Sequence, residues 1–108
     1  MADTRREKLQ AMLENDPDDQ FLRYALAMEW DKEGATDPSM ELLTRLTCDD
    51  PPHVPAYFMA GQILARASRL SESRTFLRDG IEQARQQGDT HAAGEMREFL
   101  TSLGSYGE

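Results

Sequence analysis

Apolar residues recur every three or four positions along most of the chain, which is the spacing of one face of an α-helix. The first stripe is Leu9, Met12 and Leu13. It follows Thr4 and Glu7, whose spacing is that of a capping box at a helix start. No segment alternates apolar and polar residues with a period of two, and β-branched residues are scarce. The pattern therefore predicts helices and no strands.

Helix-breaking residues divide this pattern into six segments joined by short links. The breaks lie at Asp16-Pro17, Gly34, residues 49–52, residues 68–70 and Gly88. Side-chain caps are expected at three of the later helix starts, namely Asp37, Ser71 and either Asp89 or Thr90. We therefore expect an all-α fold of about six helices.

The apolar pattern also repeats along the chain. At an offset of 36 the second and fourth segments align, which pairs Phe21 with Tyr57, Tyr24 with Ala60, Ala25 with Gly61 and Met28 with Leu64. At an offset of 34 the third and fifth segments align, which pairs Ser39 with Ser73, Leu43 with Leu77 and Leu46 with Gly80. The two offsets differ by two residues, which predicts a two-residue insertion in the turn near Gly34. A partial copy around Leu9 precedes both.

This pattern resembles the tetratricopeptide repeat (TPR) family, whose helix-turn-helix unit has a period of about 34 residues. In the second copy the family's core slots hold Tyr57, Ala60, Gly61, Leu64, Ser73, Leu77 and Gly80. Arg85 stands where the family has a closing proline. The resemblance covers about residues 5–103 and implies a right-handed stack of antiparallel helical hairpins.

The resemblance also implies a division of a single TPR-like domain over residues 1–108. Its parts are a half-repeat or capping helix at 4–16, repeat 1 at 18–51, repeat 2 at 54–88, a capping helix at 90–103 and a tail at 104–108. Small residues in the core slots allow the paired helices to pack closely. We therefore expect close packing at Gly61, where a glycine inside a helix otherwise costs roughly 1 kcal/mol against alanine.

The segment that follows Asp18 has two apolar faces. One face carries Phe21, Tyr24, Ala25 and Met28, and the other carries Leu22, Leu26 and Trp30. The resemblance implies that the second face lines a concave groove for an extended or helical peptide. The expected groove residues are Leu22, Arg23, Leu26, Trp30, Phe58, Met59, Gln62 and Arg66. The alternative is that Leu22, Leu26 and Phe58 pack in the core, and the sequence leaves both interpretations open.

Charge and composition narrow the class of partner. The chain has 108 residues, a net charge of -8 and a pI of about 4.7. An acidic protein is poorly suited to bind a nucleic-acid backbone or an anionic membrane. The acidity is uneven, since residues 16–50 carry ten acids and three bases whereas residues 53–108 carry seven and six. One cysteine and no apolar run of signal-peptide length predict a cytoplasmic protein.

The reactive side chains gather in one short run, from Cys48 through Asp49 and Asp50 to His53. These types could bind zinc or pair a thiol with an imidazole base, but no second Cys or His pair completes a zinc site. We expect no catalytic residue, metal or cofactor. The sequence predicts a non-catalytic interaction module, an adaptor or scaffold for an unknown protein or peptide, as a monomer or weak homodimer. The alternative is a self-assembling structural subunit without a ligand groove.

Overall fold

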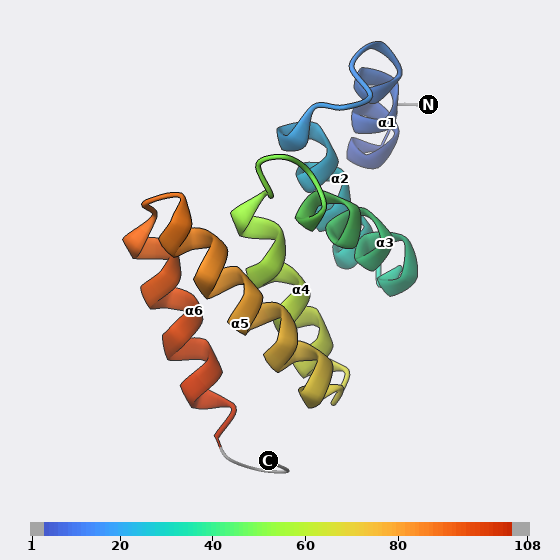
Figure 1. The fold of residues 1–108 in the computed structure, drawn as a ribbon. Coiled ribbons are helices and arrows are strands. Elements are labelled where there is room, and N and C mark those ends of the chain that lie inside the picture. Colours follow the sequence, from blue (N-terminus) through green and yellow to red (C-terminus); the bar gives the residue numbers. More distant parts are fainter. Residues whose placement is uncertain (1–3, 105–108) are drawn as a thin grey trace.

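The computed structural model describes residues 4–104 and forms six helices and no strand within that range (Figure 1). The helices are α1 (Arg5–Asn15), α2 (Gln20–Lys32), α3 (Thr36–Thr47), α4 (Val54–Arg66), α5 (Leu70–Gln86) and α6 (Thr90–Ser102). Each helix packs on the next one along the chain, so that α2 with α3 and α4 with α5 form antiparallel hairpins. The predicted all-α hairpin stack is confirmed. Apart from Gly104, the predicted tail lies outside the described residues.

Three helix starts have a side-chain cap, and those at Thr4 and Asp89 were expected. Thr4 and Glu7 form the capping box of α1, Asp19 accepts a hydrogen bond from the backbone of Leu22, and Asp89 accepts one from Ala92. The short side chains of these residues place an oxygen over the free N–H groups of the first turn.

The prediction of side-chain caps at Asp37 and Ser71 is wrong. Helix α3 starts at Thr36 and α5 at Leu70, and neither start has a side-chain cap. The preceding turns set these starts instead, because Gly34 and Ser68 adopt left-handed φ angles of 77° and 62° that close one helix and open the next.

The two hairpins correspond at one constant offset along the chain, the offset of 34 that relates Ser39 to Ser73. The Ser39 hydroxyl donates to the Ala27 carbonyl at 2.7 Å, and the Ser73 hydroxyl donates to the Gly61 carbonyl at 2.6 Å, both in the interior. Helices α2 and α4 begin and end at the same offset from each other. The offset of 36 and the insertion near Gly34 are therefore wrong, and the counterpart of Gly61 is Ala27.

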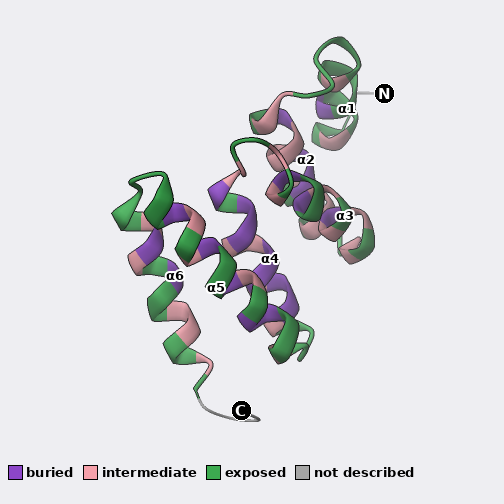
Figure 2. Cartoon of the chain, viewed as in Figure 1, coloured by how far each residue is buried: buried purple, intermediate pink, exposed green. Residues whose placement is uncertain are grey.

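The core lies between neighbouring helices, where Figure 2 shows the buried positions along α3, α4 and α5. Under α1 it consists of Leu9, Leu22 and Leu26. Between α2, α3 and α4 it consists of Ala27, Leu43, Leu46, Ala56, Ala60 and Ile63. Between α4, α5 and α6 it consists of Val54, Tyr57, Leu77, Ala84, Ala93 and Met96. Every core slot expected in the second copy is buried.

Two expected core positions of α2 lie at the surface instead. Phe21 is 75% exposed and Met28 is 37% exposed, while Leu22 and Leu26 are buried. The buried and open faces of this helix are therefore exchanged relative to the prediction. In α1, Met12 of the expected stripe is also exposed, at 52%.

Two glycines allow the close packing of the second hairpin. A Cβ atom at Gly61 would lie 2.8 Å from Cγ of Leu77, so the expected tight contact at Gly61 is confirmed. Its partner is a side chain of α5. A Cβ atom at Gly80 would lie 2.5 Å from Cβ of Tyr57 and 2.6 Å from Sδ of Met96, so Gly80 lets α5 fit between α4 and α6.

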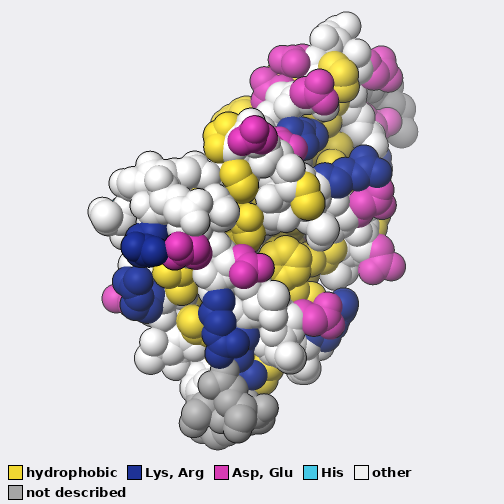
Figure 3. Space-filling view, in the orientation of Figure 1, with side chains coloured by type: hydrophobic (Ala, Val, Ile, Leu, Met, Phe, Trp, Pro, Cys, Tyr) yellow, Lys and Arg dark blue, Asp and Glu magenta, His cyan; other side chains and the backbone are white. Residues whose placement is uncertain are grey.

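The surface charge follows the asymmetry of the sequence. Figure 3 shows one face, on which Asp and Glu gather over α1 and the α1–α2 turn, while Lys and Arg gather over α5 and α6. Within residues 4–104, no helix has the length and apolar character needed to cross a membrane.

Candidate binding groove

An open groove crosses α2, α4 and α6. One depression of about 400 Å³ is lined by Tyr24, Phe58 and Met59, together with residues of α6. A second of about 540 Å³ shares Met59 and Gln62 with the first and extends to Phe99. A smaller depression of about 190 Å³ continues from Tyr24 to α1. The shared lining residues make these depressions one continuous surface, which we call the groove.

The repeat itself creates this groove. Tyr24 and Phe58 occupy equivalent positions in the two hairpins, and so do Met28 and Gln62. Tyr24 and Met28 are four residues apart on α2, and Phe58 and Gln62 are four residues apart on α4. Residues at this spacing lie on one face of a helix, so each helix presents its two side chains on the same side. The neighbouring face of each helix carries Ala27 or Gly61, whose carbonyl oxygen accepts a hydrogen bond from the buried serine hydroxyl of the following helix. The groove face of each hairpin therefore lies beside the face that packs on its partner helix.

Four of the eight expected groove residues line it, namely Phe58, Met59, Gln62 and Arg66. All four belong to α4, where the predicted orientation was correct. The two groove rings Phe58 and Phe99 meet edge to face, with centroids 5.8 Å apart and planes at 61°. Arg66 donates two hydrogen bonds of 3.0 and 2.9 Å to the carboxylate of Asp31 on α2 and thereby ties the first hairpin to the second.

The other four expected residues, Leu22, Arg23, Leu26 and Trp30, do not line these depressions. Leu22 and Leu26 are buried with Leu9 under α1, as the alternative interpretation held for these leucines. Trp30 also packs against this cluster, and the guanidinium carbon of Arg6 lies 4.6 Å from its ring centroid. Arg23 forms an ion pair with Asp49.

Sequence reasoning missed the α2 and α6 residues of the groove. On α2 these are Phe21, Tyr24, Met28 and Asp31. On α6 and its N-cap they include Asp89, His91, Glu95, Glu98 and Phe99. The available signal was the pair Ser39 and Ser73, because a constant offset of 34 would have placed Phe21 and Tyr24 opposite Pro55 and Phe58.

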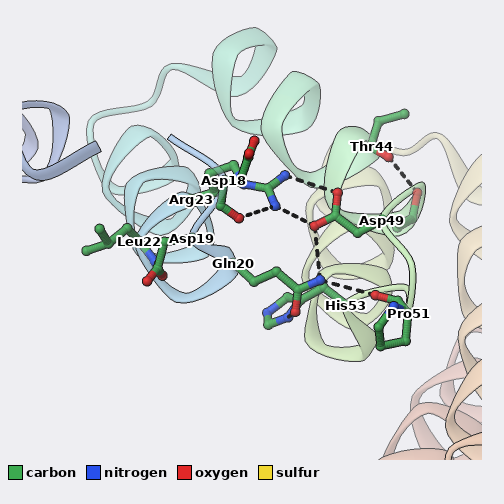
Figure 4. Close-up of polar contacts among 10 residues, drawn as sticks. Asp18, Asp19, Gln20, Leu22, Arg23, Thr44, Asp49, Pro51 and His53 are labelled. Carbon is green, nitrogen blue, oxygen red and sulfur yellow. Dashed lines mark hydrogen bonds and ion pairs between the residues drawn. The ribbon is translucent and has the colours of Figure 1, made fainter. Parts of the chain in front are cut away.

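A polar cluster joins the start of α2 to the α3–α4 link (Figure 4). Arg23 donates to both carboxylate oxygens of Asp49, at 3.2 Å to Oδ1, and to the Asp18 carbonyl at 2.9 Å. Gln20 Nε2 donates to Asp49 at 3.0 Å and to the Pro51 carbonyl at 3.1 Å. The Asp49 carboxylate thus links α2 to the segment between α3 and α4.

The same cluster determines the state of His53. Because Gln20 Nε2 faces two acceptors, its Oε1 faces His53 Nδ1, 3.3 Å away, and the ring donates from that nitrogen. The Nε2 atom is buried without a hydrogen-bond partner. Cys48 is exposed, and no group of three or more His, Cys, Asp or Glu residues within residues 4–104 is placed to hold a metal ion.

This cluster predicts a loss of stability in mild acid. Burial, aided by the Arg23 charge, lowers the pKa of His53 below its ordinary 6.5, and hydrogen bonding from Arg23 lowers the pKa of Asp49 below 3.8. The unfolded chain therefore binds more protons than the folded one. The free energy of unfolding should fall as the pH drops below about 6.5 for His53, and again below about 4 for Asp49.

Urea unfolding followed by circular dichroism between pH 7.5 and 5.5 measures the first step. His53→Gln removes the titrating group, so its stability should depend less on pH over this range than that of the wild type. Parallel curves for the two proteins would show that His53 does not cause the loss.

Comparison with known proteins supports the fold alone. No protein-family model matches the chain, and no curated protein matches it. The structure is similar to the solution structure of protein BPP2914 from Bordetella parapertussis, with a TM-score of 0.79 and 24% sequence identity. The likeness covers 94% of this chain and 89% of that one. At this identity the likeness shows that the two proteins share a fold and does not identify a ligand.

Proposed function

We propose that the chain is a non-catalytic, TPR-like interaction module that holds a peptide or helix of a partner protein in the groove. The observation that carries this proposal is the gathering of large apolar side chains that the fold leaves open. Phe21 is 75% exposed, and Tyr24, Phe58, Met59 and Phe99 are only partly buried. Apolar surface gathered in a concave site is typical of binding surfaces, and aromatic and methionine side chains are common there.

The repeat geometry supports the same function. The constant repeat offset, the small residues at Ala27 and Gly61, and the stacked hairpins are the features expected of a TPR unit. In such a stack each hairpin contacts only its neighbours, so the groove face remains available along the whole row. A reducing cytoplasmic setting, which the single exposed thiol of Cys48 favours, belongs to this proposal.

Affinity capture with three forms of the full chain tests the proposal. Phe58→Ala removes a central groove ring, and Trp30→Ala removes a partly buried ring that lies against α1. A partner held in the groove should be retained by wild type and by Trp30→Ala. It should be lost by Phe58→Ala, with binding weakened roughly 30-fold if the ring is a hot spot.

Two controls accompany this experiment. Thermal unfolding should show that Phe58→Ala stays folded, and the interaction should then be measured between purified proteins by calorimetry. Equal retention of the partner by Phe58→Ala would contradict the proposal. A tight wild-type homodimer in sedimentation, with no retained partner, would favour the self-assembling subunit instead.

A further inference from the structure

The charged side chains of the groove are mostly acidic where α4 and α6 line it. Among the described residues that line its depressions beside α4 and α6, four carboxylates face one arginine, Arg66. The carboxylates are Asp31, Asp89, Glu95 and Glu98. At the α1 end of the groove Glu29 lies beside Arg5 and Lys32, so the excess of carboxylates is confined to the side that α4 and α6 line.

Two of these four carboxylates already have partners. Asp31 accepts two hydrogen bonds from Arg66, and Asp89 accepts the backbone N–H of Ala92 at 3.0 Å. Glu95 lies 3.5 Å from Nε2 of His91, a contact that is an ion pair only when the imidazole is protonated. Glu98 makes no hydrogen bond or ion pair with any residue from 4 to 104. Within residues 4–104, the α6 side of the groove therefore carries negative charge that no ion pair with lysine or arginine neutralises.

This charge borders an apolar surface. Glu95 and Glu98 are three residues apart on α6, so their side chains are neighbours on one helix face. Together with Phe58 and Phe99 they line a depression of about 320 Å³. Two like charges beside aromatic rings favour a cation with an apolar stem, because the carboxylates attract its head while the rings contact its alkyl chain or guanidinium plane.

We propose that the occupant of the groove is an amphipathic segment of a partner protein. Its apolar side chains contact Tyr24, Phe58 and Met59, and its arginine or lysine side chains bind Glu95 and Glu98. This inference rests on the proposed function and adds the chemistry of the partner to it. Arginine suits the site best, since its planar guanidinium can bind a carboxylate through two hydrogen bonds and stack on a ring.

A phage-display selection tests the apolar contacts of the occupant and its basic side chains separately. Random 16-residue peptides on phage are selected against three immobilised forms of the full chain: wild type, Phe58→Ala, and the double variant Glu95→Gln/Glu98→Gln. Wild type should enrich peptides that combine large apolar residues with an excess of arginine and lysine over aspartate and glutamate. Neither variant should enrich the same sequences to the same degree.

An enriched peptide is then synthesised with a fluorophore, and its binding is measured by anisotropy. The Glu95→Gln/Glu98→Gln variant should bind it about three- to tenfold more weakly at low salt, as expected for two exposed ion pairs. The difference should shrink at high salt, because screening weakens both pairs. The matched control is Glu14→Gln/Glu41→Gln, which removes two charges from exposed positions on α1 and α3 and should bind like wild type.

The results that would contradict the charge inference differ from those that would contradict the proposed function. Enriched peptides without basic excess, or equal binding by the two double variants, would overturn the charge inference and leave a Phe58-dependent groove intact. No enrichment by wild type, or undiminished binding by Phe58→Ala, would overturn the proposed function itself. A wild-type dimer that Phe58→Ala converts to monomer would show that the occupant is a second copy and that this inference is wrong.

Discussion

Replacing Leu77 with alanine should lower the free energy of unfolding by about 4 kcal/mol, within the 2–5 kcal/mol range of buried leucine truncations. Leu77 is fully buried on α5 and packs against Gly61 of α4. The change removes transfer free energy and leaves a cavity that the surrounding helices refill only in part. The melting temperature should fall by roughly 15–30 °C for a domain of this size.

Urea unfolding followed by circular dichroism measures this loss, with Met12→Ala as the control. Met12 belongs to an expected apolar stripe but is 52% exposed, so its truncation should cost less than about 0.5 kcal/mol. Similar losses for the two variants would contradict the burial pattern.

A second variant tests whether Gly61 and Leu77 share one space. Alanine at Gly61 should be unfavourable beside Leu77, because the new Cβ would lie 2.8 Å from Cγ of the leucine. In the Leu77→Ala background the same Cβ fills part of the cavity, and alanine favours the helix. Adding Gly61→Ala should therefore stabilise the Leu77→Ala variant. A double-mutant cycle measures the coupling free energy between the two positions. Additive effects would show that the two positions are independent.

Replacing Gly80 with alanine should destabilise the protein by about 2 kcal/mol, as expected for overpacking. The new Cβ would lie 2.5 Å from Cβ of Tyr57, which is attached directly to the α4 backbone and cannot rotate away. It would also lie 2.6 Å from Sδ of Met96 on α6. The α5 backbone must therefore move away from two buried partners. This cost exceeds the roughly 1 kcal/mol that alanine gains over glycine within a helix.

Gly94→Ala is the matched control. Gly94 lies inside α6, and a Cβ there meets no atom within 4 Å, so only the helix-propensity gain remains. This variant should be about 0.5–1 kcal/mol more stable than wild type. The same substitution on two helices should thus change stability in opposite directions, as measured by urea unfolding of both variants. Stabilisation by Gly80→Ala would show that the α4–α5–α6 contact is not close-packed.

The α4 part of the groove was predictable, and the α2 part was not. Helix α4 has small residues at Ala60 and Gly61 beside Tyr57 and Leu64, and these residues mark the side of the helix that packs closely on its neighbours. Helix α2 has two apolar faces of similar size. Aligning the repeats by apolar spacing matched the wrong face, because that spacing recurs around a helix. The buried bonds from Ser39 and Ser73 to the preceding helix identify the register.

The α6 residues of the groove were missed for a different reason. Three helices separate Glu95 and Glu98 from Tyr24 along the chain, and no local pattern relates them. Stacking of the hairpins brings α6 beside α4 and places Phe99 against Phe58. An acidic helix surface becomes one side of an apolar groove only through that packing.

The sequence by itself determined the helices and their breaks, and it indicated the offset of 34 between the third and fifth segments, because capping residues, prolines, glycines and apolar spacing act over a few residues at a time. Only the tertiary structure decided which apolar face of α2 is covered. Periodicity defines the faces of a helix but does not say which neighbour packs on each. Here α1 covers Leu22 and Leu26, α3 binds the carbonyl of Ala27, and Phe21 and Tyr24 remain open in the groove.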